Sequence, residues 1–250
     1  MTTNAMMSYH FHQSCQIQAA KIFNSKDCKC ESGCSNEVDC ENVDRRIECS
    51  PNCRNCSNQK FRNAHQAKVI VKSSGAKGRG LFADEDINEG TFIVPYFGDV
   101  ISNKERDVRR ESYKKDGFVN YFFNSGAYTI DPTINGNDAK FANHSCDPNM
   151  FAESWRCHGM PTTFRAIAFV ASKDIKKGTE LTFNYGNEYS DDMKCFCQSE
   201  NCAGIVGKKP ISLKKKATTK NTKTTVFRKR QRIQAKEVAE RPKRHCRGNQ

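Results

Sequence analysis

Cysteine is the residue type with the clearest potential for chemistry in this chain, which has 14 of them among 250 residues. Seven lie between positions 28 and 56, and three more lie between positions 195 and 202. The N-terminus lacks the basic start and apolar run of a secretory signal, so we expect reduced thiols and not disulfides. Closely spaced thiolates in a reducing compartment are typical of zinc sites.

The first cysteine cluster predicts two structural zinc ions. Two closed tetrahedral sites need about eight thiolate positions. Seven cysteines therefore suffice only if one thiolate bridges both ions, and Cys34 is the expected bridge because it lies between the early pair and the later set. The alternatives are disulfides, which the compartment disfavours, and a metal-storage peptide, which the large attached domain disfavours. The expected ligands are Cys28, Cys30, Cys34, Cys40, Cys49, Cys53 and Cys56.

The second cluster consists of Cys195, Cys197 and Cys202, and it lacks a fourth ligand. The stretch FANHSCDPN, residues 141–149, contains a single thiol in a polar loop, so Cys146 is the expected fourth ligand. Protein thiolates would fill every position of such a site, which indicates a structural ion and not a catalytic one. The pattern gives no role to the remaining cysteines, Cys15, Cys157 and Cys246.

The net charge of +13 is concentrated in one segment. Of the 41 basic and 28 acidic side chains, 16 basic and 2 acidic ones lie in residues 208–250, which leaves residues 1–207 near neutral. Since this tail has few large apolar side chains, we expect it to be disordered. Its basic blocks favour nuclear import or contact with nucleic-acid phosphates over a role in solubility alone. No stretch reaches the ~18 apolar residues of a membrane span.

Short apolar and β-branched runs separated by Gly, Asn and Asp predict a mostly β domain. The expected strands lie within residues 67–74, 90–102, 121–132, 162–175 and 178–186. Residues 103–115, NKERDVRRESYKK, predict a polar, exposed helix. The segment DINEGTFIVPYFG (86–98) is echoed by DIKKGTELTFNYG (174–186). The echo predicts one turn used twice, with Gly90 and Gly178 at positions open to positive φ.

Several separated motifs resemble the SET-domain protein lysine methyltransferases. They are KGRGLFA (77–83), GNDAKFANHSCDPN (136–149) and ELTFNYG (180–186), in the order and spacing of that family. CFCQSENC, which begins at Cys195, resembles its post-SET motif. The seven-cysteine segment, with RIECSPNC ahead of CSNQKF, resembles the AWS module of the subgroup that acts on lysine 36 of histone H3. The resemblance covers about residues 26–207.

This resemblance implies a mostly β (α+β) SET-domain fold, in which the segment carrying ELTFNYG threads beneath the loop carrying NHSC as a pseudoknot. Threaded chains are rare, so the pattern alone does not predict this feature. The implied organisation is an N-terminal segment (1–25), an AWS zinc module (26–66), a SET catalytic domain (67–187), a post-SET zinc motif (188–207) and a basic tail (208–250).

The cofactor implied by the resemblance is S-adenosylmethionine. Gly78 and Gly80 would let the backbone approach it closely. Asn143 and His144 would hold its adenosine part, and Phe196 would cover the adenine ring. The full set of implied cofactor-binding residues is Lys77, Gly78, Arg79, Gly80, Asn120, Tyr121, Asn143, His144, Tyr185 and Phe196.

The implied catalytic residues are Tyr185, Tyr121 and Phe183. A lysine ammonium has a pKa of ~10.4, and only its neutral amine can attack a methyl donor. An aromatic channel desolvates the amine and favours loss of its proton, after which Tyr185 orients it. Without the neighbouring motifs, Tyr185 would be an ordinary strand aromatic. Phe183 occupies a place where phenylalanine leaves room for further methyl groups in this family, so we expect di- or trimethylation.

Three departures from the family pattern bear on the expected site. Arg79 stands where AWS-bearing relatives usually have an aromatic residue. Lys140 replaces an arginine ahead of the NHSC motif, and Asn184 replaces an aspartate ahead of the tyrosine. Because lysine lacks the planar donor fork of arginine, the change at Lys140 is expected to loosen the threaded loop.

The expected function is methylation of a histone tail, at lysine 36 of histone H3 in nucleosomes, by a monomeric, chromatin-associated enzyme of the nucleus. Contact of the basic tail with DNA would be accessory, supplying salt-sensitive affinity without sequence readout. Two alternatives remain open. One is a catalytically silent SET-fold chromatin scaffold, and the other is a zinc-stabilised nucleic-acid-binding protein.

Overall fold

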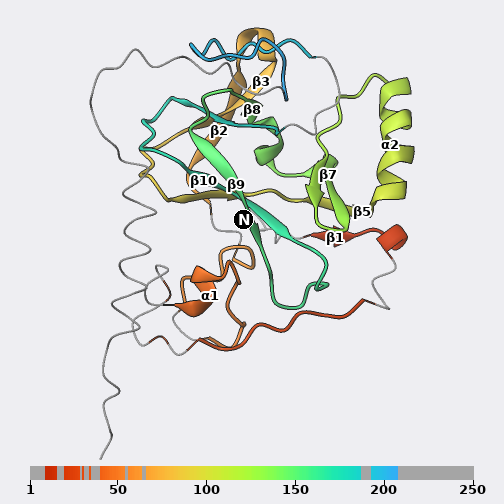
Figure 1. Ribbon diagram of the computed structural model, residues 1–250, viewed down its shortest axis with the longest axis vertical. Coiled ribbons are helices and arrows are strands. Elements are labelled where there is room, and N and C mark those ends of the chain that lie inside the picture. The colour runs from red at the N-terminus through yellow and green to blue at the C-terminus, as the bar shows by residue number, and fades with distance from the viewer. Residues whose placement is uncertain are drawn as a thin grey trace, which may run out of the picture. The chain divides into compact units, whose positions relative to one another are not determined.

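The computed structural model describes residues 9–15, 20–28, 30, 34, 40–53, 56–63, 66–186 and 193–207. All of them belong to the first of two compact units, Met1–Ile211. The basic tail and the expectation of disorder there lie outside the described residues. Strands dominate the described part, as the sequence predicts (Figure 1). Among the described residues, no helix has the length and apolar character that crossing a membrane requires.

Three sheets make up the β structure of the described residues. The first has the strand order β1 (His10–Phe11), β5 (Gly98–Ser102), β7 (Tyr128–Gly136), β6 (Phe123–Ser125). The second has the order β4 (Phe92–Pro95), β10 (Ala166–Ala171), β9 (Met150–Trp155), and the third the order β2 (Val69–Ser73), β3 (Arg79–Ala83), β11 (Glu180–Phe183), β8 (Asn143–His144). The helices are α1 (Glu41–Asp44) and α2 (Asn103–Lys115), with 3-10 turns η1 (Gln13–Cys15), η3 (Gly75–Lys77) and η4 (Asp138–Phe141).

Every segment predicted as β contains at least one strand, and the predicted helix has the bounds of α2. The core lies among the three sheets, where all six residues of β10 are buried. Strands β1, β3, β8 and β9 were not predicted. In β9 only the first and last residues are buried, so its sequence lacks the alternation by which a half-buried strand is recognised.

Helix α2 is set by local signals. Its N-cap is Ser102, whose Oγ accepts a hydrogen bond from the backbone N–H of Glu105 at 3.2 Å. A serine followed three residues later by a glutamate is the sequence of a capping box. Lys114 and Lys115 lie in the last turn, where cations stabilise the helix dipole. None of the side chains of α2 is buried, as its polar sequence predicts.

Arg109 attaches α2 to the first sheet. Asp99 of β5 and Asp131 of β7 are directly opposite each other in the ladder, which would be repulsive if their charges were not compensated. One guanidinium nitrogen of Arg109 lies 3.1 Å from Asp99 Oδ2 and 2.8 Å from Asp131 Oδ2. Tyr113 donates a hydrogen bond to Asp131 at 2.9 Å, and the Asp131 side chain is fully buried.

The two echoing segments pair with each other. Ile87 and Ile175 exchange both of their backbone hydrogen bonds, each at 2.8 Å. The aspartate that opens each segment accepts a backbone N–H from the other segment at 2.9 Å. Gly90 and Gly178 have φ values of +80° and +86°, which confirms the predicted positive-φ turns. The repeated sequence is therefore a reciprocal contact between two chain segments far apart in sequence.

The loop that follows Phe141 contains β8 and lies against β11. β8 pairs in parallel with β11, so that Asn143 is opposite Thr182 and His144 is opposite Phe183. The side chain of Asn149 adds two hydrogen bonds to the backbone of β11, at 2.9 Å and 2.8 Å. These contacts place the segment that ends at Tyr185 against the NHSC loop, as the implied threading requires.

We expect Arg109→Ala to lower the free energy of unfolding by about 3 kcal/mol, because it leaves the buried Asp131 carboxylate without its cation. Urea denaturation measures this change. The matched control is Arg110→Ala, since Arg110 pairs with the exposed Asp107 and its own side chain is 48% exposed. The control should change the free energy by less than about 1 kcal/mol. Equal effects of the two substitutions would contradict the role of Arg109.

Candidate functional site

Aromatic rings gather around the end of β11. The ring of Phe183 lies with its centroid 4.6 Å from that of Phe169, 6.0 Å from Phe123 and 4.8 Å from Tyr185. Phe123 and Phe169 come from β6 and β10, so three sheets contribute to this aromatic cluster. Tyr185 is only half-buried, whereas Phe183 is buried. The cluster can therefore desolvate a group that approaches Tyr185 from solvent.

Tyr185 is held at two points by the NHSC loop. Its hydroxyl donates to the backbone oxygen of Ala142 at 3.1 Å, and its backbone N–H donates to His144 Nδ1 at 3.2 Å. Because the phenolic proton is directed to a carbonyl, the oxygen lone pairs remain able to accept a hydrogen bond from another group. The tyrosine can thus orient an amine without giving up its own proton.

His144 connects the aromatic cluster with a cysteine. Its ring is buried, and burial lowers its pKa, which favours the neutral form. Since Nδ1 accepts the Tyr185 N–H, the ring proton of the neutral form belongs on Nε2. Nε2 lies 3.5 Å from Cys146 Sγ, so this N–H points at the sulfur atom. The structure therefore gives the His144 side chain a connecting role, which the sequence did not indicate.

Tyr121 lies near the same cluster. Its ring packs edge-on against Phe141 at 5.9 Å, and its backbone oxygen accepts a hydrogen bond from the Tyr96 hydroxyl at 2.6 Å. Burial raises the pKa of Tyr96, and the nearby Tyr185 and Tyr121 raise it further. Tyr96 is therefore close to both tyrosines that the sequence singles out.

The glycine turn ahead of β3 is joined to the NHSC loop. Gly78 has a φ of +79° and open space around it, whereas a Cβ on Gly80 would lie 2.8 Å from a Glu180 oxygen. Asn143 Nδ2 donates to the Arg79 backbone oxygen at 3.0 Å and to Glu180 Oε1 at 2.9 Å. Glu180 was not among the predicted site residues, although it lies inside the ELTFNYG motif.

The departures from the family pattern have identifiable contacts. The Arg79 guanidinium stacks over the Phe141 ring at 4.1 Å from its centroid. Lys140 donates to the backbone oxygens of Pro132 and Thr133 at 2.9 Å and 3.3 Å, so it ties the loop to β7. The sequence predicts that lysine at this position loosens the loop, but these two hydrogen bonds hold the loop against β7. Asn184 is exposed and accepts the N–H of Gly186.

Four of the expected cofactor residues are exposed, namely Gly78, Arg79, Asn120 and Phe196. Asn120 precedes Tyr121 in an exposed stretch. Phe196 has 40% of its surface exposed, and the ammonium of Lys194 lies 5.4 Å from its ring centroid. Within the described residues, Phe196 makes no ring contact with the aromatic cluster. Its place over a bound adenine stays a prediction.

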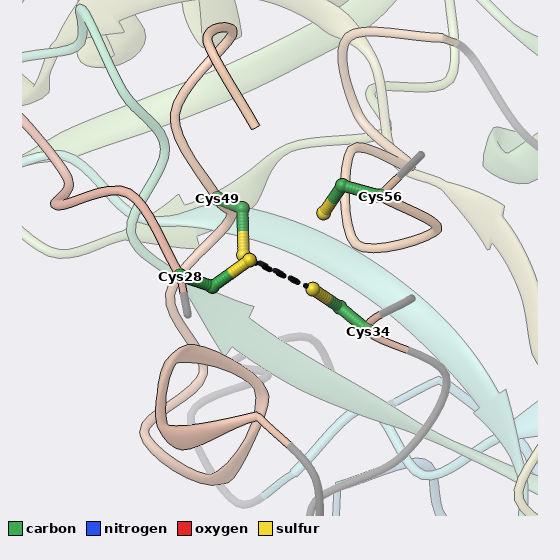
Figure 2. A group of neighbouring side chains, drawn as sticks. All are labelled: Cys28, Cys34, Cys49 and Cys56. Atoms are coloured by element: carbon green, nitrogen blue, oxygen red, sulfur yellow. Dashed lines mark hydrogen bonds between the residues drawn. The ribbon is translucent and has the colours of Figure 1, made fainter. Parts of the chain in front are cut away.

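The N-terminal cysteines form two overlapping groups. Cys28, Cys34, Cys49 and Cys56 have their sulfur atoms within 4.8 Å of one another, and Figure 2 shows these side chains converging from separate loops. Cys28, Cys30, Cys34 and Cys40 form the other group. Both groups contain Cys34, the expected bridge, and both also contain Cys28. Cys53 belongs to neither group, but its sulfur atom accepts the Cys28 N–H at 3.2 Å.

Short contacts between the thiols of these groups shift their pKa values in opposite directions. Cys28 Sγ and Cys34 Sγ are 3.0 Å apart. Burial acts to raise the pKa of Cys28, but the hydrogen bond to Cys34 and further contacts lower it to about 6. Burial raises the pKa of Cys34, as do its hydrogen bonds to neighbouring thiols. One thiolate is thus available near neutral pH, and a cation would replace the protons that the others retain.

The C-terminal cysteines and Cys146 converge on one point. Cys146, Cys195, Cys197 and Cys202 have their sulfur atoms within 4.8 Å of one another, as the sequence predicts. Burial acts to raise the pKa of Cys197, but hydrogen bonds from Ser199 and other groups lower it to about 6. The residues without an assigned role differ. Cys15 donates to the Val100 oxygen, Cys157 is buried near Glu48, and Cys246 lies outside the described residues.

We expect Cys146→Ser to remove one bound transition-metal ion per chain, because the C-terminal group then has three thiolates and cannot close a tetrahedron. Mass spectrometry of the metals in purified protein measures this loss. Cys15→Ser is the control. A serine hydroxyl can still donate to the Val100 oxygen, and Cys15 belongs to none of the three cysteine groups. Equal metal content in the Cys146 variant and the unaltered protein would contradict the site.

Comparison with known proteins agrees with this geometry. Residues 78–186 match the SET domain. The chain is 36% identical over 190 residues to histone-lysine N-methyltransferase SETD2 of Homo sapiens, which covers 73% of this chain and 7% of the relative. It is 32% identical over 214 residues to an H3 lysine-36 specific histone-lysine N-methyltransferase of Coccidioides immitis, with 82% and 20% covered. It is 35% identical over 192 residues to histone-lysine N-methyltransferase Set2 of Drosophila melanogaster, with 73% and 8% covered.

The similarity has a definite extent. This chain spans about a fifth or less of the length of these curated relatives. Within the chain, however, the similarity reaches beyond the SET domain match and covers most of the residues. The matched segment contains the glycine turn, the NHSC loop and the aromatic cluster, which are the parts that the structure brings together. The chain therefore belongs to the SET-domain family.

Proposed function

We propose that this chain is an S-adenosylmethionine-dependent histone-lysine N-methyltransferase that acts on lysine 36 of histone H3. The observation that carries the proposal is the setting of Tyr185. Its hydroxyl proton is directed to the Ala142 oxygen, its ring borders an aromatic cluster, and its backbone is fixed by His144. The names of the relatives, which include an H3 lysine-36 specific histone-lysine N-methyltransferase, support this choice of substrate.

The residues around the NHSC loop fit the proposed cofactor. Gly78 leaves open space on the backbone, and Asn143 fixes the same turn through the Arg79 oxygen. In this proposal, Lys77, Arg79, Gly80 and His144 complete this part of the binding site. Asn120 and Phe196 would be added from exposed segments. When bound, the cofactor supplies a methyl group activated by a sulfonium cation.

The substrate amine requires desolvation and orientation. The rings of Phe183, Phe123 and Phe169 exclude water, and low polarity favours the neutral amine over the ammonium. The Tyr185 oxygen can then accept one N–H of the amine, which directs the nitrogen lone pair along a fixed line. Tyr121 forms a second wall beside Phe141. Most of the rate acceleration would come from this positioning.

The proposed metal content is three structural zinc ions. Two would lie in an AWS module, residues 26–66, and share the Cys34 thiolate. One would lie in a post-SET motif, residues 188–207, and be bound also by Cys146 from the SET domain, residues 67–187. Four-thiolate sites leave no open position for water, so these ions stabilise the fold and take no part in the reaction.

The proposed setting is chromatin in the nucleus. The histone H3 tail in nucleosomes would be the main partner of a monomeric enzyme, and residues 208–250 would add salt-sensitive contact with DNA. A silent scaffold and a zinc-stabilised nucleic-acid-binding protein are the competing functions. The hydrogen-bonded setting of Tyr185 favours the enzyme. Neither competing function needs a phenol whose proton is donated to a backbone carbonyl, here that of Ala142.

We expect Tyr185→Phe to lower the rate of methyl transfer to nucleosomes by a factor on the order of 10², because the variant loses the acceptor that orients the amine. Transfer of a labelled methyl group measures the rate. Binding of S-adenosylmethionine should be unchanged within about threefold, since the ring is retained. A variant as active as the unaltered protein would remove Tyr185 from the mechanism.

We expect Phe183→Tyr to shift the products toward monomethyl-lysine, because an added hydroxyl would occupy space beside the amine. Mass spectrometry of the modified histone measures the distribution of methylation states. The substitution Phe82→Tyr on β3 is a suitable control, since it adds the same atom to an aromatic residue outside the aromatic cluster. An unchanged distribution in the Phe183 variant would show that this position does not limit methylation.

A further inference from the structure

Glu180 contacts three side chains, two from the turn ahead of β3 and one from β8. It opens β11, and its side chain is 19% exposed. Oε1 accepts hydrogen bonds from Ser74 Oγ at 2.6 Å and from Asn143 Nδ2 at 2.9 Å, and Oε2 forms an ion pair with Lys77. Ser74 and Lys77 flank the turn ahead of β3, and Asn143 belongs to β8. One carboxylate therefore joins segments that are far apart in the sequence.

The backbone packs closely around this carboxylate. A Cβ on Gly80 would lie 2.8 Å from Glu180 Oε1 and 2.9 Å from Ser74 Cβ, so only glycine leaves the carboxylate in place. The turn closes on itself through the Ser74 N–H, which donates to the Gly78 oxygen at 2.6 Å. Asn143 reaches both the carboxylate and the Arg79 oxygen. The side-chain and backbone contacts thus fix the turn from two sides.

The charge of the carboxylate is maintained by its partners. Burial acts to raise the pKa of Glu180, but hydrogen bonds from Lys77, Ser74 and Asn143 outweigh burial and lower it. The side chain is therefore an anion at neutral pH, and hydrogen bonds to an ionised acceptor are about twice as strong as neutral ones. A neutral amide of the same shape would lose the ion pair and present an N–H₂ group to other donors.

We propose that Glu180 is a positioning residue, whose carboxylate holds the turn of residues 74–80 and Asn143 in the arrangement that receives the cofactor. This inference rests on the proposed function and deepens it. Glu180 acts through Lys77, Ser74 and Asn143, so its loss should raise the fraction of molecules in which the turn is displaced. The apparent affinity for a ligand falls in proportion to the fraction of molecules that remain competent.

The test uses the full chain with Glu180→Gln, Ser74→Ala and the double variant. Glu153→Gln is the matched control, because Glu153 is also partly buried, at 15% exposed, and also pairs with a cation, Arg46. It belongs to β9, in a different sheet. Three quantities are measured: hydrogen exchange of the Lys77 and Gly78 amides without ligand, calorimetric affinity for S-adenosylmethionine, and the methyl-transfer rate at saturating cofactor.

We expect Glu180→Gln to bind S-adenosylmethionine about tenfold more weakly, which corresponds to a competent fraction of about one tenth. The two amides should exchange faster than in the unaltered protein. The rate at saturating cofactor should stay within about twofold, as for an effect on binding alone. Ser74→Ala should have a smaller effect, and it should add little in the Glu180 variant because both act on the same contact. Glu153→Gln should leave affinity and exchange unchanged.

Two results would overturn the assignment. One is unchanged exchange and affinity in the Glu180 variant, and the other is an equal change in the Glu153 variant, which would indicate a general loss of stability. Absence of cofactor binding by the unaltered protein would refute the proposed function instead. Because the exchange measurement uses no ligand, it still tests whether Glu180 holds the turn in that case.

Discussion

The parallel pairing of β8 with β11 is the contact on which the rest of the site depends. Only two residue pairs define the ladder, yet the pairing sets Asn143 and His144 beside the segment that leads to Tyr185. The Asn149 side chain adds hydrogen bonds to the β11 backbone, so the register does not rest on backbone contacts alone. A slip by one residue would reverse the faces on which these side chains lie.

The proposed metal site of Cys146, Cys195, Cys197 and Cys202 would stabilise the same pairing of β8 with β11. Cys146 lies two residues after His144, the second paired residue, and converges with cysteines that come after Tyr185 in the sequence. His144 lies between them, with one nitrogen on the Tyr185 backbone and the other directed at the Cys146 sulfur. A cation bound by the C-terminal cysteines would therefore restrain both chain segments that form the tyrosine site.

The residues that depart from the expected family pattern make defined contacts of their own. Arg79 stacks on Phe141 and so covers one face of that ring. Lys140 uses an ammonium in place of a guanidinium to contact carbonyl oxygens of β7. The contacts of Glu180 with the glycine turn involve a charged partner, Lys77, and the Ser74 hydroxyl.

Features that depend on residues close together in the chain could be predicted from the amino-acid sequence. Helix α2 follows from its serine cap and polar face, and Gly90 and Gly178 follow from turns that need positive φ. The ligand type of the cysteine groups follows from their spacing. Tertiary structure alone decided that both N-terminal groups include Cys28, that the echoing segments pair, and that one carboxylate joins three segments. Those features depend on contacts between residues far apart in the chain, and local spacing carries no information about such distances.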